Sequence, residues 1–247
     1  PLFNAGIGAT CTAEGTFELD ASIMEGKDLS AGAVAGLKHV KHPINAAYAV
    51  KTKSPHVMLS GAGAEEFAKE QGLEMVEDNM YFATPKTMEW IEKLKQESNG
   101  TVGCVVLDKQ GNLTAGTSTG GMFKKRWGRI GDSPVIGAGT YADNNSCAVS
   151  CTGHGEYFIR HAVAFDVCAR YKYLKESVEK AADYIIHTEL NTNAGNGGLI
   201  AVDKLGNIAM PYNSGGMFRG FLYKEKGSPE IKKGCGIGKK IVVVGEK

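Results

Sequence analysis

The 247-residue sequence lacks a long apolar run and any block of charges of one sign. Its longest aliphatic stretch near the end, Ile241 to Val244, has the length of a strand, whereas a membrane helix needs about 20 apolar residues. The 28 basic and 27 acidic residues leave a formal net charge of +1, which indicates neither a nucleic-acid groove nor an acidic tail. We therefore expect no membrane partner and no nucleic-acid partner.

The sequence also lacks paired cysteine motifs and metal-ligand spacings. Most of the six cysteines stand among apolar residues, so we interpret them as buried free thiols, which favour a reducing compartment. They are Cys11, Cys104, Cys147, Cys151, Cys168 and Cys235. The chain begins with Pro1 and shows no signal-like segment. The thiols favour a cytoplasmic location, and a periplasmic one stays open because the first residue is not Met.

Glycine, in contrast, is abundant, with 33 of 247 residues, roughly twice the usual share of about 7%. The glycines follow no period and gather in short motifs, which is typical of tight turns and of backbone that lies close to a ligand. Hydrophobic residues make up 43% of the chain, enough for a substantial core.

The first hundred residues predict a strand followed by three helices. Pro43 suits the first position of a helix, and Gly72 is a stop signal. The predicted elements are a strand around Thr10 to Leu19, a helix from Pro43 through Asn45 to Val50, a helix over Ala64 to Gln71, and a helix over Pro85 to Glu97 that gives way to a polar link ending at Gly100.

Two similar hairpins are predicted in the rest of the chain, each with an Asp-Lys-x-Gly-Asn turn and a later Gly-Gly-Met-Phe. Gly111 and Gly206, like Gly120 and Gly215, are 95 residues apart. The predicted strands are Val102 to Leu107, Leu113 to Thr117, Leu199 to Val202 and Ile208 to Met210, and helices are expected over about Glu156 to Tyr171 and Lys175 to Glu189. Antiparallel hairpins with separate helices favour a layered α+β domain over a doubly wound fold.

Thr101 stands where the polar link meets a buried strand. If the bond between Gly100 and Thr101 is cut, Thr101 gains a free α-amine whose pKa near 7.7–8.0 lets it act as a base. A threonine paired with its own terminal amine is an activated nucleophile. On these residues alone, a threonine that merely begins a strand is an open alternative.

Three downstream motifs could surround such a nucleophile. Thr117 to Gly121 ends a strand in hydroxyls and glycines, although a polar turn would look the same. Arg129 and Asp132 lie in a stiff loop and suit the carboxylate and ammonium of an amino acid, or else form an internal ion pair. Cys151 to Glu156 can form an anion site or oxyanion hole. A phosphate loop is the alternative there, but the Gly-Lys-Ser/Thr of a P-loop is missing. We expect His154 to face solvent or cap the loop.

Taken together, these motifs resemble the plant-type asparaginase/isoaspartyl aminopeptidase family of N-terminal-nucleophile hydrolases. They follow the family order over almost the whole chain, and their combination is specific although each motif alone is not. The matching strings are Pro1 to Gly8, Leu19 to Met24, Gly32 to Gly36, Ser54 to Val57, Gly100 to Gly103, Thr117 to Gly121, Gly128 to Pro134, Gly137 to Gly139 and Cys151 to Glu156.

The resemblance implies a four-layer αββα sandwich that cleaves itself between Gly100 and Thr101. Residues 1–100 and 101–247 would become two subunits of one domain, and two such processed heterodimers would pair as a dimer. By resemblance Thr101 is the nucleophile and Thr119 holds its amine and hydroxyl. Thr152 and Gly153 form the oxyanion hole, and Asn4 lies near the nucleophile.

The resemblance also assigns the binding residues. Arg129 would bind the substrate α-carboxylate, Asp132 the α-amine, and the Gly155 carbonyl would help bind the amine. No cofactor is expected for catalysis. A structural sodium ion is expected on the backbone carbonyls of Phe3, Ala5 and Ile7.

The expected activity is the release of L-aspartate from β-aspartyl dipeptides, from L-asparagine, or from both, because both present the same head group and β-carbonyl. A non-catalytic, unprocessed relative that only binds amino acids, or a glycosylasparaginase-like threonine hydrolase, are the alternatives. Three features depart from the family. Its first strand, which ends in a His-Gly-Gly-Ala-Gly-like loop, is absent here, and the link before Thr101 is short. Lys124-Lys125-Arg126 adds positive charge that would favour acidic peptide substrates.

Overall fold

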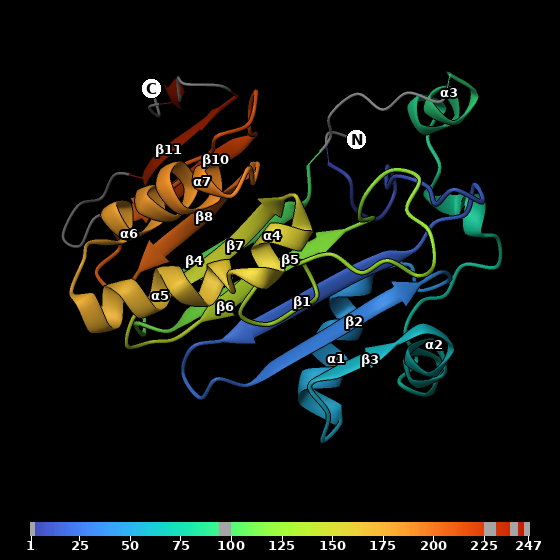
Figure 1. Cartoon of the computed structure of the whole chain (residues 1–247). Coiled ribbons are helices and arrows are strands. Elements are labelled where there is room, and N and C mark those ends of the chain that lie inside the picture. Colours follow the sequence, from blue (N-terminus) through green and yellow to red (C-terminus); the bar gives the residue numbers. More distant parts are fainter. Residues whose placement is uncertain (1–2, 94–99, 225–230, 238–241, 245–247) are drawn as a thin grey trace.

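The computed structural model describes residues 3–93, 100–224, 231–237 and 242–244, and these form a mixed α+β fold (Figure 1). The larger sheet has the order β3-β2-β1-β5-β4, with β2 and β3 parallel and the other neighbours antiparallel. Its strands are β1 (Leu19–Glu25), β2 (Ala31–Leu37), β3 (Met58–Ser60), β4 (Val102–Leu107) and β5 (Leu113–Thr119).

The second and third sheets are antiparallel throughout. The second has the order β6-β7-β8-β9 and consists of β6 (Thr140–Ala142), β7 (Cys147–Gly153), β8 (Gly197–Asp203) and β9 (Ile208–Ala209). The third has the order β10-β11-β12 and consists of β10 (Arg219–Lys224), β11 (Ile231–Gly236) and β12 (Val242–Val244).

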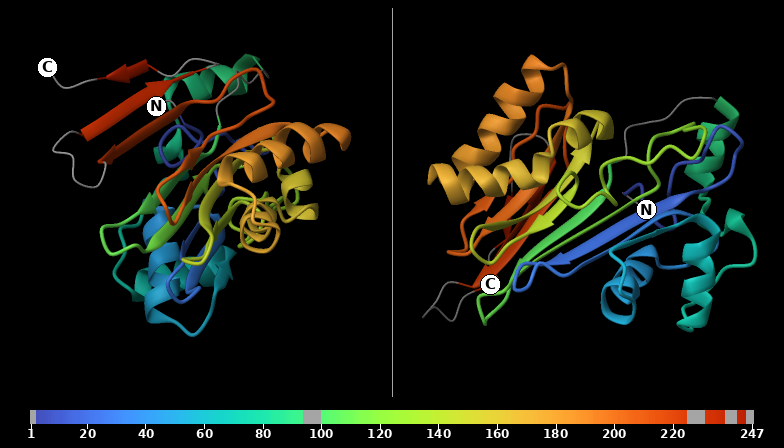
Figure 2. Two further views of the ribbon diagram at one scale, coloured as in Figure 1. Left: turned by 90° about the vertical axis from the view of Figure 1, so that its left-hand side faces the viewer. Right: turned by 60° about the horizontal axis from the view of Figure 1, so that its bottom comes forward.

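Helices lie on different sides of these sheets, as the right-hand view of Figure 2 shows. In that view α1 lies on the β1–β2 side, whereas α5 and α6 lie beyond the β7–β8 side. The α-helices are α1 (Pro43–Lys53), α2 (Gly61–Glu70), α3 (Pro85–Lys93), α4 (Gly155–Arg160), α5 (Val163–Leu174), α6 (Val178–Tyr184) and α7 (Leu190–Thr192). Asn79–Phe82 forms a 3₁₀ turn, and Ile185–Glu189 forms a π-helical turn after α6.

Three clusters of buried side chains make the core. One joins β1 and β2 to α1 and includes Phe17 and Val34, and another joins β7 and β8 to α5 and α6 and includes Phe158 and Ile185. The third lies between the larger and second sheets, where most of the buried side chains are small, such as Ala115. The faces of these two sheets therefore pack against each other.

Hydroxyl groups also bridge the two sheets. The Thr117 hydroxyl on β5 lies 2.7 Å from the Ser150 hydroxyl on β7, and the Ser22 hydroxyl on β1 lies 2.8 Å from the Thr140 hydroxyl on β6. These groups are buried, so their mutual hydrogen bonds remove the cost of unsatisfied polar atoms. This polar seam lies next to the ends of β5 and β7, where the site residues follow.

The two predicted hairpins are confirmed and share their turn chemistry. In each, the Asp carboxylate accepts backbone N–H groups from residues two and four positions later, at 2.8 Å in the first turn and 2.8 and 2.9 Å in the second. Gly111 and Gly206 have φ of 84° and 89°, which glycine adopts without strain. The hairpins belong to different sheets, so the 95-residue repeat places one hairpin with this turn in the larger sheet and one in the second sheet.

Most predicted elements of the first hundred residues are confirmed, with one error. Pro43 opens α1, and Gly72, with φ of 71°, follows the end of α2, which begins earlier than expected at Gly61. The strand predicted over Thr10 to Leu19 is wrong: Thr12 N–H bonds the Thr16 carbonyl across a turn, and β1 begins at Leu19. The end of the helix predicted over Pro85 to Glu97 lies outside the described residues, and β2 was not predicted.

Residues with left-handed backbone set limits of the two later helical regions. Ala162, with φ of 45°, separates α4 from α5, so the expected helix over Glu156 to Tyr171 is two helices. Lys175 also has a positive φ, of 58°. The next helix starts at Val178, after Ser177, whose hydroxyl caps it by accepting the N–H of Lys180.

Candidate active site

Thr101 precedes β4, and its side chain meets the last residue of β5. The Thr101 hydroxyl donates a hydrogen bond of 3.1 Å to the Thr119 hydroxyl, which accepts the N–H of Gly121 at 3.0 Å. Val102 is the register partner of Ser118, so Thr101 lies opposite Thr119 at the open end of the ladder. Thr101 is half-buried and Thr119 is buried. The nucleophile predicted from the sequence is thus held by a second hydroxyl.

The carbonyl of Gly100 lies beside the predicted nucleophile and accepts a hydrogen bond from the backbone N–H of Asn4 at 2.9 Å. Asn4 is itself fixed: its side-chain amide donates to the Gly121 carbonyl at 2.7 Å, and its side-chain oxygen accepts from Thr10 N–H at 2.7 Å. A buried side chain with all these partners has little freedom. Asn4 therefore ties the segment before Thr101 to the loop after Thr119.

Thr152 and Gly153 end β7 on the other side of the Gly100 backbone. A Cβ added at Gly100 would lie 3.2 Å from the Thr152 hydroxyl. Gly153 is paired with Gly197 of β8, and a Cβ at Gly153 would come within 2.7 Å of the Gly197 Cα. The tight pairing needs two glycines, and at this strand end the predicted oxyanion residues are half-buried (Thr152) and exposed (Gly153).

Arg129 does not pair with Asp132, which was the open alternative for these two residues. Its guanidinium instead makes two hydrogen bonds with Glu156, from Nε to Oε1 and from Nη2 to Oε2, both of 2.9 Å. These bonds hold the pKa of Glu156 below its usual value. The Arg129 side chain is mostly buried, so the pair forms a fixed group at the start of α4.

Asp132 is buried, and its Oδ2 has no hydrogen-bond partner within the part of the chain that the structure describes. Burial raises its pKa to about 7, although its own backbone N–H and Arg129 oppose the shift. Gly155 lies next to both head-group candidates: a Cβ there would be 2.9 Å from Arg129 Nη2 and 3.0 Å from Asp132 Oδ1. An unpaired carboxylate oxygen beside an arginine is suited to a ligand ammonium.

The residues of the predicted substrate site thus form two connected groups. Thr101, Thr119 and Thr152 meet around Gly100. Arg129 and Asp132 meet around Gly155, three residues after Thr152. The end of β7 and the turn into α4 join the two groups.

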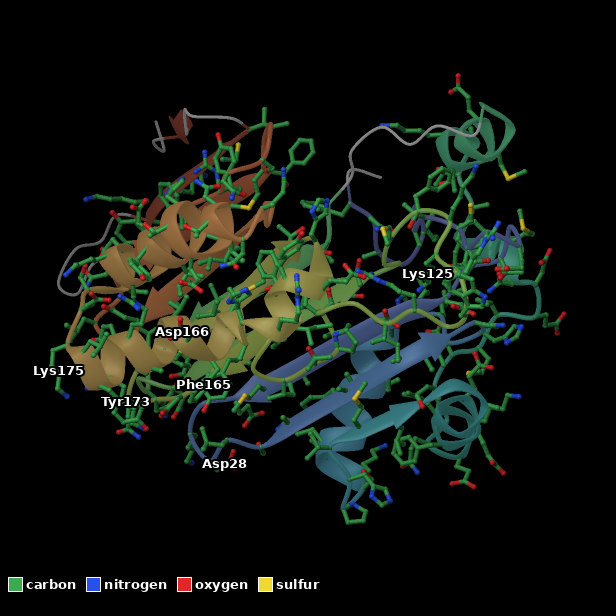
Figure 3. All side chains as sticks on the ribbon, viewed as in Figure 1. Asp28, Lys125, Phe165, Asp166, Tyr173 and Lys175 are labelled. Carbon is green, nitrogen blue, oxygen red and sulfur yellow. The ribbon has the colours of Figure 1, made fainter. Side chains whose placement is uncertain are left out.

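Lys125 differs from the expectation that the three basic residues attract acidic substrates. Its side chain is buried, its Nζ donates to the Glu18 carbonyl at 2.9 Å, and its pKa is lowered by burial. Figure 3 shows Lys125 in the loop that follows β5, well away from Asp28 in the turn after β1. Lys124 and Arg126 are exposed, so only these two add surface charge.

The turn predicted to hold sodium contains Gly6 and Gly8 with positive φ. The Asn4 carbonyl accepts from Gly120 N–H and the Gly6 carbonyl accepts from Ala9 N–H. Over residues 3–93 and 100–224 no backbone hydrogen bond to the carbonyls of Phe3, Ala5 or Ile7 is found. The same described residues contain no group of three His, Cys, Asp or Glu side chains that could hold a metal ion.

Sequence reasoning missed three residues that support the site. Glu156 was seen only as part of a motif. Asp20, the register partner of Thr119, is buried with one carboxylate oxygen unpartnered in the described chain, and burial raises its pKa. Asn213 accepts from Gly197 N–H at 2.8 Å and donates to the Gly195 carbonyl at 3.0 Å, so it fixes the strand that faces Gly153. Its place shortly before the second Gly-Gly-Met-Phe was the available signal.

A half-buried hydroxyl, a second hydroxyl that binds it, and a guanidinium and a buried carboxyl group that both lie beside Gly155 form a set suited to hydrolases that act on amino-acid amides. The sequence model of the family described as Asparaginase matches residues 1–231, and the chain belongs to this family.

Curated relatives agree with this membership. An isoaspartyl peptidase of Salmonella typhimurium is 48% identical, over 90% of this chain and 76% of the relative. A probable isoaspartyl peptidase/L-asparaginase 2 of Arabidopsis thaliana is 44% identical, over 89% of this chain and 77% of the relative. A human isoaspartyl peptidase/L-asparaginase is 41% identical, over 88% of this chain and 73% of the relative. The chain is therefore a hydrolase of this family. In the described residues no helix is both long and apolar enough to cross a bilayer.

Proposed function

We propose that the chain cuts itself between Gly100 and Thr101 and then releases L-aspartate from β-aspartyl dipeptides and from L-asparagine. One observation carries the proposal: the Thr101 hydroxyl is bonded to Thr119 while the adjoining Gly100 carbonyl accepts the Asn4 N–H. The nucleophile and the carbonyl that it must attack are each held by a separate partner.

Self-cleavage follows from this arrangement. The Thr101 oxygen attacks the Gly100 carbonyl carbon, and the Asn4 N–H stabilises the negative charge that develops on the Gly100 oxygen. The C–N bond breaks and the Thr101 nitrogen takes the hydroxyl proton, which leaves Gly100 joined to Thr101 through an ester. Water then hydrolyses the ester, giving a Gly100 carboxylate and a Thr101 with a free amine and a free hydroxyl.

Substrate hydrolysis uses the same hydroxyl with the new amine as its base. Thr101 attacks the side-chain amide carbon of asparagine, or the β-linked carbonyl of a β-aspartyl dipeptide, and its amine accepts the proton. Thr152 and Gly153 stabilise the tetrahedral anion. The proton returns to the leaving ammonia or amine, and water cleaves the resulting ester and releases aspartate. Thr119 keeps the hydroxyl in position throughout.

Substrate choice follows from the head-group residues. Arg129 binds the α-carboxylate, while Asp132 and the Gly155 carbonyl bind the α-ammonium. Asparagine and a β-aspartyl residue each place their reacting carbonyl one methylene from this head group. An ordinary α-peptide lacks the free carboxylate that Arg129 would bind, so the site favours β-linked amides.

We infer a four-layer αββα arrangement of the sheets and helices. Supporting it are the three core clusters, one between the two facing sheets and one under the helices on each side. We further propose that residues 1–100 and 101–247 are the two subunits of one domain, and that two processed heterodimers form a dimer. The turn at Phe3, Ala5 and Ile7 offers carbonyl oxygens that suit a sodium ion, which would stiffen the turn that holds Asn4.

Substitution of Thr101 by Ala tests the function. We expect the variant to stay one chain in an intact-mass measurement and to lose aspartate release by roughly 10⁴-fold or more, because the nucleophile is gone. Wild-type protein should give two masses that meet at the bond between residues 100 and 101. Thr114→Ala is the matched control: Thr114 is also half-buried but lies on β5, away from the bond, and this variant should be cleaved and active. A native chain that hydrolyses asparagine with this bond unbroken would contradict the proposal.

A further inference from the structure

We propose that Glu156 is a positioning residue that holds one edge of the Arg129 guanidinium, so that the other edge meets the substrate α-carboxylate. The inference rests on the proposed function, since it gives Arg129 a carboxylate to bind. It adds a residue to the site and states which atoms of Arg129 bind the substrate.

The two edges of the guanidinium are distinguished by their partners. Arginine has five N–H donors, and a carboxylate can bind two parallel ones at the Nε/Nη2 edge or at the Nη1/Nη2 edge. Glu156 takes the first edge with two bonds of 2.9 Å. The second N–H of Nη2 and one N–H of Nη1 remain side by side and make up the end edge, while the other N–H of Nη1 points back toward Cδ.

The end edge lies close against two glycines, where a side chain would clash with the guanidinium. A Cβ at Gly131 would come within 2.8 Å of Arg129 Nη1, and a Cβ at Gly155 within 2.9 Å of Nη2. The same Cβ at Gly155 would lie 3.0 Å from Asp132 Oδ1. An amino-acid head group placed over Gly155 can therefore reach the end edge with its carboxylate and Asp132 with its ammonium.

Glu156 is well placed to set this orientation. It follows Gly155 directly and lies in the first turn of α4, so its backbone is fixed to the end of β7 and to the predicted oxyanion residues. Arg129, in contrast, lies on a loop in which Trp127 and Gly128 both have positive φ. The Arg129 side chain is 18% exposed and that of Glu156 is 52% exposed. The more buried guanidinium is thus held by a carboxylate that reaches it from a more regular element.

A competing role gives the opposite sign. If Glu156 occupied the place of the substrate carboxylate, every substrate would have to displace it, and its removal would tighten binding. Positioning predicts weaker binding when Glu156 is changed. Charge-assisted bidentate bonds are among the stronger hydrogen bonds of proteins, so either effect would be measurable.

The test compares Glu156→Gln with wild type on two ligands. For L-asparagine we expect KM to rise about tenfold or more while kcat changes less than about threefold, since Arg129 binds the ground state and transition state alike. For L-asparaginamide, which has an amide in place of the α-carboxylate, KM should stay within about twofold. Calorimetric titration with L-aspartate should show the same loss of affinity without any turnover.

Glu176→Gln is the matched control. Glu176 forms an equivalent pair with Arg170, at 2.9 and 3.4 Å, far along the chain in the connection between α5 and α6, and this variant should leave both KM values unchanged. A fall in KM for asparagine in Glu156→Gln, an unchanged KM, or an equal rise for both ligands would overturn the inference. A wild-type chain that binds aspartate but does not hydrolyse asparagine contradicts the proposed function alone, and one that binds no aspartate contradicts both.

Discussion

The carboxyl group of Asp132 lies where an ion gains little stabilisation, with one oxygen unpartnered in the described chain. Burial raises its pKa to about 7 from an ordinary value near 4. Between these two values the native protein keeps a proton that the unfolded chain has lost. The protonated Asp132 therefore makes its full contribution to the free energy of unfolding below about pH 4, and this contribution declines as the pH rises to about 7. A substrate ammonium would supply the charge that the ionised carboxylate lacks.

Asp132→Asn should remove this pH dependence. We expect the wild-type free energy of unfolding to fall by a few kcal/mol between pH 4.5 and pH 7.5, on the order of 1.4 kcal/mol per unit of pKa shift, and the variant to fall much less. Urea unfolding at both pH values measures this. The wild-type KM should also improve as the pH rises through about 7, because binding needs the ionised form.

Asp143→Asn is the contrasting control. Burial raises the pKa of Asp143, but hydrogen bonds from Asn145 and Lys172 together outweigh burial and hold it below its usual value. The ionised Asp143 thus stabilises the protein at pH values above its pKa in the unfolded chain, and this stabilisation is lost as the pH falls through its lower pKa in the folded protein. Its replacement should leave the decline between pH 4.5 and 7.5 intact, and a wild-type protein without that decline would refute the role given to Asp132.

At the scale of elements, Gly103 lets β4 of the larger sheet approach β7 of the second. A Cβ at Gly103 would overlap the hydroxyl of Ser150 and come within 2.9 Å of its Cβ. Gly103→Ala should therefore lower the free energy of unfolding by about 1–3 kcal/mol, the usual effect of overpacking. It should also slow the cleavage at Thr101, because Thr101 lies two residues before the displaced strand position. Urea unfolding and a cleavage time course followed by mass measure the two effects.

Gly116→Ala is the matched control for this change. Gly116 lies on the neighbouring β5, and a Cβ there would meet its nearest atoms at 3.7 Å, an ordinary contact. The variant should be neutral or slightly stabilising, since alanine lowers the entropy of the unfolded chain. Equal stability losses in both variants would show that strand glycines matter for a reason other than the approach of β7.

How far the sequence predicts the elements depends on whether the signal is local. The hairpin turns were predictable because Asp108 and Asp203 satisfy their own turns. The error at Thr10 to Leu19 arose because the turn at Thr12 is held partly from a distance, by the Ala13 N–H bond to the Lys125 carbonyl. The break at Ala162 has no local glycine or proline to announce it.

The same distinction applies to the site. The residues that the family resemblance names occur in continuous motifs, and the structure brings Thr101 to Thr119 and both Arg129 and Asp132 to Gly155. The pairing of Arg129 with Glu156, 27 residues away, depends on how the loop folds onto α4. No local pattern in the sequence predicts a contact between two such distant residues.

At the scale of the whole molecule, the segments before and after the bond at Gly100 belong to one sheet. Strand β1 from the first segment pairs with β5 from the second through six register positions, from Asp20 opposite Thr119 to Glu25 opposite Thr114. The N-terminal turn adds contacts, since Asn4 bonds both Gly120 and Gly121. Figure 1 shows β1 and β5 as neighbours in this sheet. Cutting the bond removes none of these contacts.

We therefore expect cleaved protein to elute as a single native species at the volume of the intact chain and to separate into two pieces only after denaturation. Cleavage also turns folding into an association of two chains, so the Tm of the cleaved protein should rise with protein concentration. The uncleaved Thr101→Ala variant is the control, because unfolding of a single chain gives a Tm that does not depend on concentration. Any dependence that comes from dimer formation should be the same in the cleaved protein and in the variant. Pieces that separate under native conditions would show that the strand pairing between β1 and β5 does not hold the halves together. The two segments would then be independent units, whereas the shared sheet requires each to complete the other.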